Sequence, residues 1–174
     1  MIKLLGAVLI LFAGTAIGFV QASAYINRTK QLRQLIHALQ RLETEINYGQ
    51  TELPTALVKC CEGLQSPVSK LFIKTSDLLK AEPEQQLSME EAWQLSIAEE
   101  WGSTALRTRE KEVLLRMSSV LGMSATHDQL KHLQLAQLQL KSEEEVAREE
   151  QARYANMWRS LGTLGAILIV ILMV

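Results

Sequence analysis

The sequence predicts an all-α protein, an antiparallel bundle of about six helices between an N-terminal and a C-terminal transmembrane helix. Three observations lead to this fold. The chain of 174 residues carries an uncharged apolar segment at each end. Between these segments, apolar side chains recur at the spacings of three and four that are typical of helices. No stretch alternates apolar and polar residues with the Val, Ile and Thr enrichment of a strand.

The N-terminal segment, residues 4–26, is predicted to be a transmembrane helix. No charge occurs from Leu4 to Asn27, and roughly 20 apolar residues suffice to cross the ~30 Å hydrocarbon core. A cleaved signal peptide is the alternative, because Lys3, the apolar run and Ala22-Ser23-Ala24 resemble its three parts. The run is longer than the apolar core of a signal peptide, and positive charge after it favours a cytoplasmic flank. The bases that follow are Arg28, Lys30 and Arg33. We therefore predict an uncleaved anchor with both termini outside and the middle of the chain inside.

The C-terminal segment, residues 157–174, is predicted to be a second transmembrane helix. Leu161 to Val174 carries no charge, but its length as a helix is only about 21 Å. Trp158 suits the headgroup interface, and Arg159 can extend its charged end outward while its stem stays in the apolar layer. A buried C-terminal helix of a soluble domain is the alternative.

The middle of the chain, residues 27–156, is predicted to form a cytoplasmic helical domain. Gly49 is suited to end its first helix, and Ser66-Pro67 to begin a later one with the serine as cap. Ser88 with Glu91 forms a predicted capping box. The last helix is expected to run unbroken from about residue 127 into the C-terminal anchor. The first helix carries one apolar stripe, which consists of Leu32, Leu35, Ile36, Leu39, Leu42 and Ile46.

Charge and motifs argue against several classes of function. With 18 basic and 19 acidic residues, the chain lacks the basic surface of a nucleic-acid-binding protein. The nucleotide-binding, zinc-protease and serine-hydrolase motifs are missing from the sequence. His127 and His132 are five residues apart, and Cys60 and Cys61 are adjacent, so neither pair has the usual spacing of zinc ligands. We predict no enzyme activity, catalytic residue, metal, cofactor or small-molecule substrate, and two core cysteines.

Both apolar segments carry a pattern of small residues. Gly14 and Gly18 are separated by three residues, and Gly162 and Ala166 repeat that spacing. Such patterns let transmembrane helices approach each other closely, although they also arise by chance. We predict that these four residues pack the two anchors together.

Charged residues near the membrane lead to a second prediction. Counting equal distances from the ends of the two anchors places Arg33 level with Arg153, and Arg41 level with Glu145. We therefore predict that Arg41 faces Glu145 and Arg33 faces Glu149, and that these pairs help to fix the register of the first and last helices. The alternative is that all these charges are simply solvated, since exposed ion pairs contribute only ~0–1 kcal/mol.

Several stretches of the chain, in order, resemble one known family. At the start these are Lys3-Leu4-Leu5-Gly6-Ala7 and Gln31-Leu32-Arg33-Gln34-Leu35. In the middle they are Ala38 to Ile46, Tyr48-Gly49, Pro67 to Phe72, and Leu121-Gly122 with Asp128. The last is Met157-Trp158-Arg159-Ser160-Leu161-Gly162. Together they are similar to the stage III sporulation protein AB family of endospore-forming Firmicutes. After Thr51 the chain has Glu52, where the family usually has proline.

The resemblance implies a function that periodicity and spacing do not. It implies a component of the channel complex between mother cell and forespore, in the mother-cell membrane around the forespore. The cytoplasmic domain would resemble those of type II secretion inner-membrane platform proteins. Its expected partners are the membrane and other proteins of the same sporulation operon, including a cytoplasmic ATPase. The alternative is a membrane adaptor or regulatory protein that docks a soluble partner and has no channel role.

Overall fold

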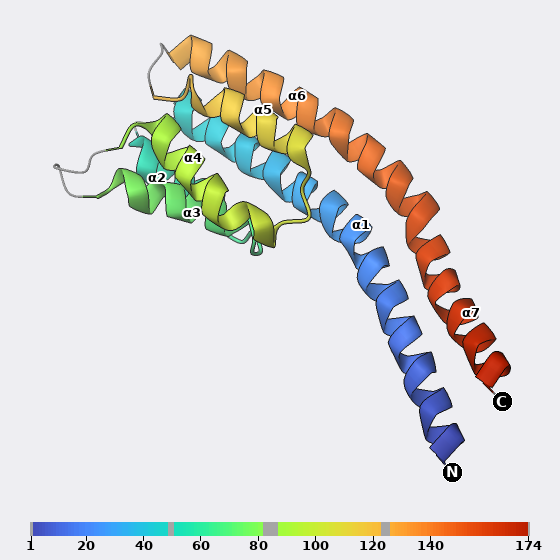
Figure 1. Cartoon of the computed structure of the whole chain (residues 1–174). Coiled ribbons are helices and arrows are strands. Elements are labelled where there is room, and N and C mark those ends of the chain that lie inside the picture. Colours follow the sequence, from blue (N-terminus) through green and yellow to red (C-terminus); the bar gives the residue numbers. More distant parts are fainter. Residues whose placement is uncertain (1, 49–50, 82–86, 123–125, 174) are drawn as a thin grey trace. The chain divides into compact units, whose positions relative to one another are not determined.

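A computed structural model of the chain describes residues 2–48, 51–81, 87–122 and 126–173. This part of the chain is helical and contains no strand, which confirms the predicted all-α class. Gly49, the predicted end of the first helix, lies outside it. The helices, shown in Figure 1, are α1 (Ile2–Tyr48), α2 (Leu53–Cys60), α3 (Val68–Leu79), α4 (Met89–Glu100), α5 (Thr108–Ser118), α6 (Thr126–Glu150) and α7 (Asn156–Met173).

Two of the predicted helix starts have different outcomes. The capping box of α4 is confirmed, because the Ser88 hydroxyl accepts from the Glu91 amide and the Glu91 carboxylate accepts from the Ser88 amide. The predicted cap at Ser66 is wrong. Pro67 occupies the cap position of α3, and no side chain caps that helix. The Ser66–Pro67 peptide bond is cis.

The last helix is also less regular than predicted. A π-helical turn at Gln151–Ala155 separates α6 from α7, so the expected uninterrupted α-helix contains one wider turn. A short 3-10 turn, Trp101–Ser103, likewise follows α4.

The chain divides into two compact units, which we describe separately. The helical domain is residues 30–144, and its core is formed by large apolar side chains. In this domain α3 packs against both α2 and α4. Phe72 of α3 and Trp93 of α4 are fully buried and meet edge to face, with ring centroids 5.1 Å apart. The predicted stripe of α1 is buried from Leu32 to Leu42, and Cys60 and Cys61 are buried as predicted.

The other unit, which we call the terminal helix pair, is residues 1–29 and 145–174. It contains the first part of α1, the end of α6, the π turn and α7. Its large apolar side chains point outward: Phe12 is 76% exposed, Val20 68% and Leu164 63%. Within the described residues, one helical stretch, Thr126–Ile171, is long and apolar enough to cross a membrane.

Candidate interaction sites

The four small residues predicted to pack the terminal segments lie against one another. A Cβ added to Gly14 would lie 2.7 Å from the Ala166 Cβ, and one added to Gly18 would lie 2.8 Å from the Trp158 carbonyl oxygen. A Cβ on Gly162 would lie 2.7 Å from the Gly14 carbonyl oxygen. Distances below about 3 Å to backbone atoms leave no room for a side chain, so α1 and α7 are in backbone contact here. This is the geometry that small residues allow between transmembrane helices.

Gly165 of α7 differs from these three glycines. A Cβ on Gly165 would meet no atom within 4 Å. It lines an apolar groove of about 410 Å³ that follows the helix pair from Ile10 and Ile169 to Trp158. The position therefore serves as an internal control for the close contacts at Gly14, Gly18 and Gly162.

Further along the terminal helix pair the contacts become aromatic and charged. The Arg159 guanidinium lies 5.3 Å from the centre of the Phe19 ring. Tyr25 and Tyr154 place their ring centroids 5.7 Å apart. Arg28 donates from Nη1 to Oε2 of Glu150 at 3.1 Å, and its side chain is only 4% exposed. A buried arginine needs such a partner, because an unpaired charge away from water is costly.

In the helical domain, polar side chains join α1 to later helices. Oε1 and Oε2 of Glu43 accept from the side-chain amides of Gln134 and Gln137, each at 2.7 Å. Oε1 of Gln31 accepts from the backbone amide of Ala105 at 2.7 Å. These bonds tie α1 to α6 and to the segment before α5. Carboxylate bonds of this kind are stronger than neutral ones and fix geometry.

The two arginines of the predicted charge pairs have other partners. Arg33 donates from Nε to Oε1 of Glu144 at 2.7 Å, and Arg41 donates from Nη1 to the Glu62 carbonyl oxygen at 2.6 Å. Glu145 and Glu149 are exposed side chains on α6. Arg33 thus meets α6 nine residues before Arg153, the residue predicted to be level with it. Glu145 and Glu149 belong to the terminal helix pair and the two arginines to the helical domain, so the pairing of Arg41 with Glu145 and of Arg33 with Glu149 stays a prediction.

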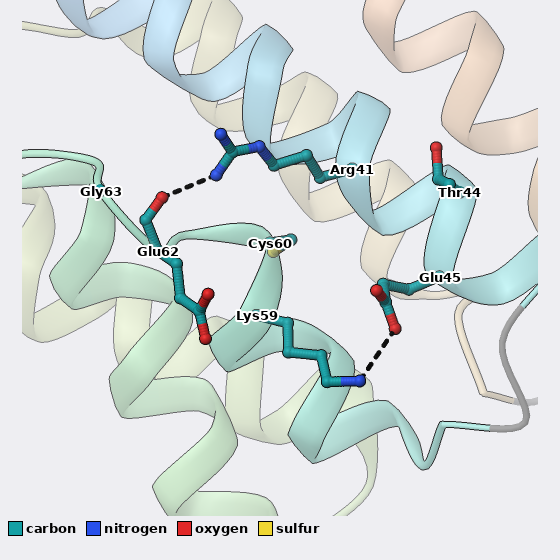
Figure 2. A pocket seen from close by; sticks show the side chains of 7 residues that line it. All are labelled: Arg41, Thr44, Glu45, Lys59, Cys60, Glu62 and Gly63. Atoms are coloured by element: carbon teal, nitrogen blue, oxygen red, sulfur yellow. Dashed lines mark hydrogen bonds and ion pairs between the residues drawn. The ribbon is translucent and has the colours of Figure 1, made fainter.

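A polar groove of about 690 Å³ lies between α1 and the end of α2, as Figure 2 shows. Arg41 reaches across it to Glu62, and Lys59 approaches Oε2 of Glu45 at 3.5 Å. The Glu45 carboxylate also accepts from the Thr51 hydroxyl at 3.0 Å. Two cations and two carboxylates therefore face one cavity, with side chains that come from different segments. The residues that line this polar groove are Arg41, Thr44, Glu45, Lys59, Cys60, Glu62 and Gly63.

Cys60 lines the polar groove but is not poised for nucleophilic chemistry. Burial away from water raises the pKa of its thiol far above the ordinary value, and the neighbouring Cys61 adds to that effect. Burial also raises the pKa of Cys61. Both thiols are free and donate to the carbonyl three residues earlier. The thiolate is the reactive form of cysteine, so these residues are inert core side chains.

Sequence patterns did not predict the contacts of Glu43, Gln31 and Glu144. Glu43 and Glu144 lie among many charged residues of similar spacing, and a glutamine has no distinct sequence signal. Their partners are on distant segments, so only the register of the helices could have found them. In the portion that the structure describes, no three metal-binding side chains cluster, and His127 and His132 are exposed on α6.

Comparison with known proteins gives consistent matches along nearly the whole chain. Residues 3–174 match the family model described as stage III sporulation protein AB. The chain is 40% identical over 173 residues to the stage III sporulation protein AB of Bacillus subtilis (strain 168), and the match covers 99% of each. A solved structure of a stage III sporulation protein AB superposes with a TM-score of 0.67 at 38% identity. That match covers 73% of this chain and 98% of the solved one.

Proposed function

Because the chain belongs to the stage III sporulation protein AB family, we propose that it is a non-enzymatic platform component of the sporulation channel complex. In this role α1 and α7 both cross the mother-cell membrane around the forespore. The helical domain is an antiparallel bundle in the cytoplasm. It carries out the same kind of task as the helical domains of type II secretion platform proteins, to which the family resemblance points.

The observation that carries the membrane role is the outward-facing apolar surface of the terminal helix pair. Its large side chains, such as Phe12, Leu164 and Ile171, are more than half exposed. Its contact is made by backbone and small side chains at Gly14, Gly18, Gly162 and Ala166. In water this arrangement would leave a large apolar patch uncovered. In lipid it is favourable, because close packing and not apolar burial drives helix association there.

The polar groove is the surface that we propose for the cytoplasmic ATPase. Its charged side chains, Arg41, Glu45, Lys59 and Glu62, come from two segments and line one cavity. The partner would offer a segment with charges of both signs, since the groove itself is balanced. The terminal helix pair would meanwhile contact membrane proteins of the complex.

Crosslinking in sporulating cells tests the proposed role. A platform component is expected to be recovered with both the cytoplasmic ATPase and several membrane proteins of the same operon. Recovery of one soluble partner, with no membrane protein, would favour the alternative of a membrane adaptor without a channel role. Mild-detergent co-purification of the full-length chain provides an independent measurement.

Matched charge reversals test the polar groove. Arg41→Glu should abolish crosslinking to the ATPase and leave the crosslinks to membrane proteins unchanged. Arg116→Glu is the control, because Arg116 is also an exposed helical arginine whose guanidinium donates to a backbone carbonyl, that of Glu112. Equal loss in both variants would contradict the groove as the docking surface.

Labelling of intact cells tests the topology. Ser119 is exposed in the helical domain, and Ser119→Cys should be shielded from membrane-impermeant thiol reagents until the cells are opened. Cys60 and Cys61 do not interfere, because they are buried. Labelling of position 119 without lysis would place the domain outside and support the cleaved signal peptide instead.

A further inference from the structure

The contacts of the terminal helix pair show which residues of α1 lie beside Arg159 of α7. Its guanidinium lies over the Phe19 ring, and the adjacent Trp158 carbonyl abuts Gly18. Phe19 is eight residues before Asn27, at which the uncharged stretch of α1 ends. At about 1.5 Å per residue, the charge of Arg159 is therefore some 12 Å within that stretch. A hydrocarbon layer that reached Asn27 would have to enclose this charge.

Beyond this level the helix pair changes its chemistry. On the terminal side of Phe19 and Arg159 both helices are predominantly apolar, and Lys3 is their only charged side chain by sequence. On the other side polar and aromatic side chains gather, and the buried Arg28–Glu150 pair follows them. We define the six residues of this band as the collar: Gln21, Tyr25, Arg153, Tyr154, Trp158 and Arg159. Tyrosine and tryptophan are enriched at the level of lipid headgroups.

The two arginines of the collar differ from Arg28. Arg28 is buried and paired with Glu150, whereas Arg153 and Arg159 are exposed. Arg153 lies 5.6 Å from the centre of the Tyr154 ring, and Arg159 lies over Phe19. Among the described residues, no carboxylate forms an ion pair with either of them. A planar guanidinium held over an aromatic ring keeps its donors free for a phosphate group.

We infer that the surface of the hydrocarbon layer crosses the helix pair at Phe19 and Arg159, and that the collar lies among lipid headgroups, where Arg153 and Arg159 bind lipid phosphates. This inference rests on the proposed membrane role. It gives the two helices apolar segments of similar length, since Leu4 to Phe19 then matches Leu161 to Val174. Both are shorter than the ~30 Å hydrocarbon core, and the bilayer thins locally to fit them.

Depth measurements at two matched positions test the level of the membrane surface. Val20 and Leu9 are both aliphatic residues of α1 and are 68% and 61% exposed. A layer from Leu4 to Asn27 would place position 20 seven residues from one edge and position 9 five residues from the other. The two positions would then be similarly deep. A surface at Phe19 places position 20 outside the hydrocarbon and position 9 within it.

The full-length Val20→Cys and Leu9→Cys variants are labelled with a nitrobenzoxadiazole fluorophore and reconstituted in equimolar phosphatidylcholine and phosphatidylglycerol. Quenching is compared between lipids with a nitroxide on the headgroup and lipids with one near the chain end. We expect the headgroup nitroxide to quench position 20 more strongly, and the chain-end nitroxide to quench position 9 more strongly. Equal chain-end quenching at both positions would overturn the inference. A chain that does not float with the vesicles would instead contradict the membrane role itself.

The same fluorophore tests the two arginines. Phosphatidylglycerol with a nitroxide near the top of its acyl chain should quench position 20 more than the matching phosphatidylcholine. Each arginine is expected to enrich the anionic lipid about fivefold at that site. Arg153→Gln with Arg159→Gln should remove the difference, while Arg116→Gln in the helical domain should preserve it. An unchanged preference in the double variant would overturn the assignment of these arginines.

Discussion

In the terminal helix pair, glycines make the contact and large apolar side chains face outward, whereas the helical domain has the reverse arrangement. Gly18 and Gly162 bring two backbones together, while Phe12 and Ile171 are exposed. In the helical domain, Phe72 and Trp93 fill the core and are fully buried. Under the proposed membrane role, this difference follows from the surroundings of each unit. Burial of large side chains stabilises a unit in water, but it gains little between helices in lipid.

The largest effect is expected from emptying the core of the helical domain. Trp93→Ala should lower the free energy of unfolding by about 3–5 kcal/mol, because it leaves a cavity as well as losing buried area. Thermal unfolding of the full-length chain in detergent, followed by circular dichroism, measures the change. Trp101→Ala is the control, since Trp101 is only partly buried. Similar losses in the two variants would mean that core packing does not distinguish these positions.

A charge placed on the outward face of α7 tests the surroundings of the other unit. Ile167 is 46% exposed, and Ile167→Lys should cost about 2.5–3.5 kcal/mol in membrane insertion. The variant should lose membrane association and sporulation function while its helical domain stays folded. The same substitution at an exposed position of the helical domain, Leu138→Lys, should be tolerated. Normal sporulation with Ile167→Lys would count against a membrane role for this end.

A side chain added at the glycine contact should separate the two terminal helices. Gly162→Leu forces a side chain against backbone atoms of Gly14 and Gly18, and overpacking of this kind costs about 1–3 kcal/mol. Crosslinking of Tyr25→Cys to Tyr154→Cys by a bifunctional thiol reagent, at positions whose native rings are in contact, should then fall sharply. Gly165→Leu should leave the crosslink intact, because its Cβ meets open space. Equal yields from both variants would show that the glycine contact does not hold the pair.

The smallest effect concerns a water-exposed helix end. The Ser88 amide and hydroxyl donate to the Glu91 carboxylate and lower its pKa below the ordinary value of 4.5. A lowered pKa in the folded state stabilises the domain above the unfolded value, and this contribution is lost as the pH falls through the folded value. The Tm difference between the wild type and Glu91→Gln should therefore be constant near neutral pH and vanish in acid. In a Ser88→Ala background this pH dependence should become smaller but persist, because alanine loses the hydroxyl and keeps the backbone amide that donates to Glu91.

Local sequence patterns predicted the features whose interacting residues are close in the sequence, and failed for polar contacts between distant segments. The helices, the Ser88–Glu91 cap and the buried cysteines follow from neighbouring residues. The register of α1 against α6 does not. We expected Arg41 to face Glu145 and Arg33 to face Glu149, whereas within the helical domain Arg33 donates to Glu144 and Arg41 to the Glu62 carbonyl oxygen. The spacing of the small residues predicts this register better. If Gly18 lies beside Gly162 in two antiparallel helices, Arg33 of the first helix lies near residue 147 of the last.

The π turn at Gln151–Ala155 had no sequence signal, since it depends on contacts on both sides of it. One of its consequences concerns the phase of the helix. Ala147 and Ala166 are both buried and are nineteen residues apart. In an uninterrupted α-helix, at about 100° per residue, their side chains would point about 100° away from each other. The π turn takes up one extra residue and brings the two alanines onto one face. The segment can therefore vary in sequence far more easily than in length, because deleting one residue would turn the glycine face of α7 away from α1.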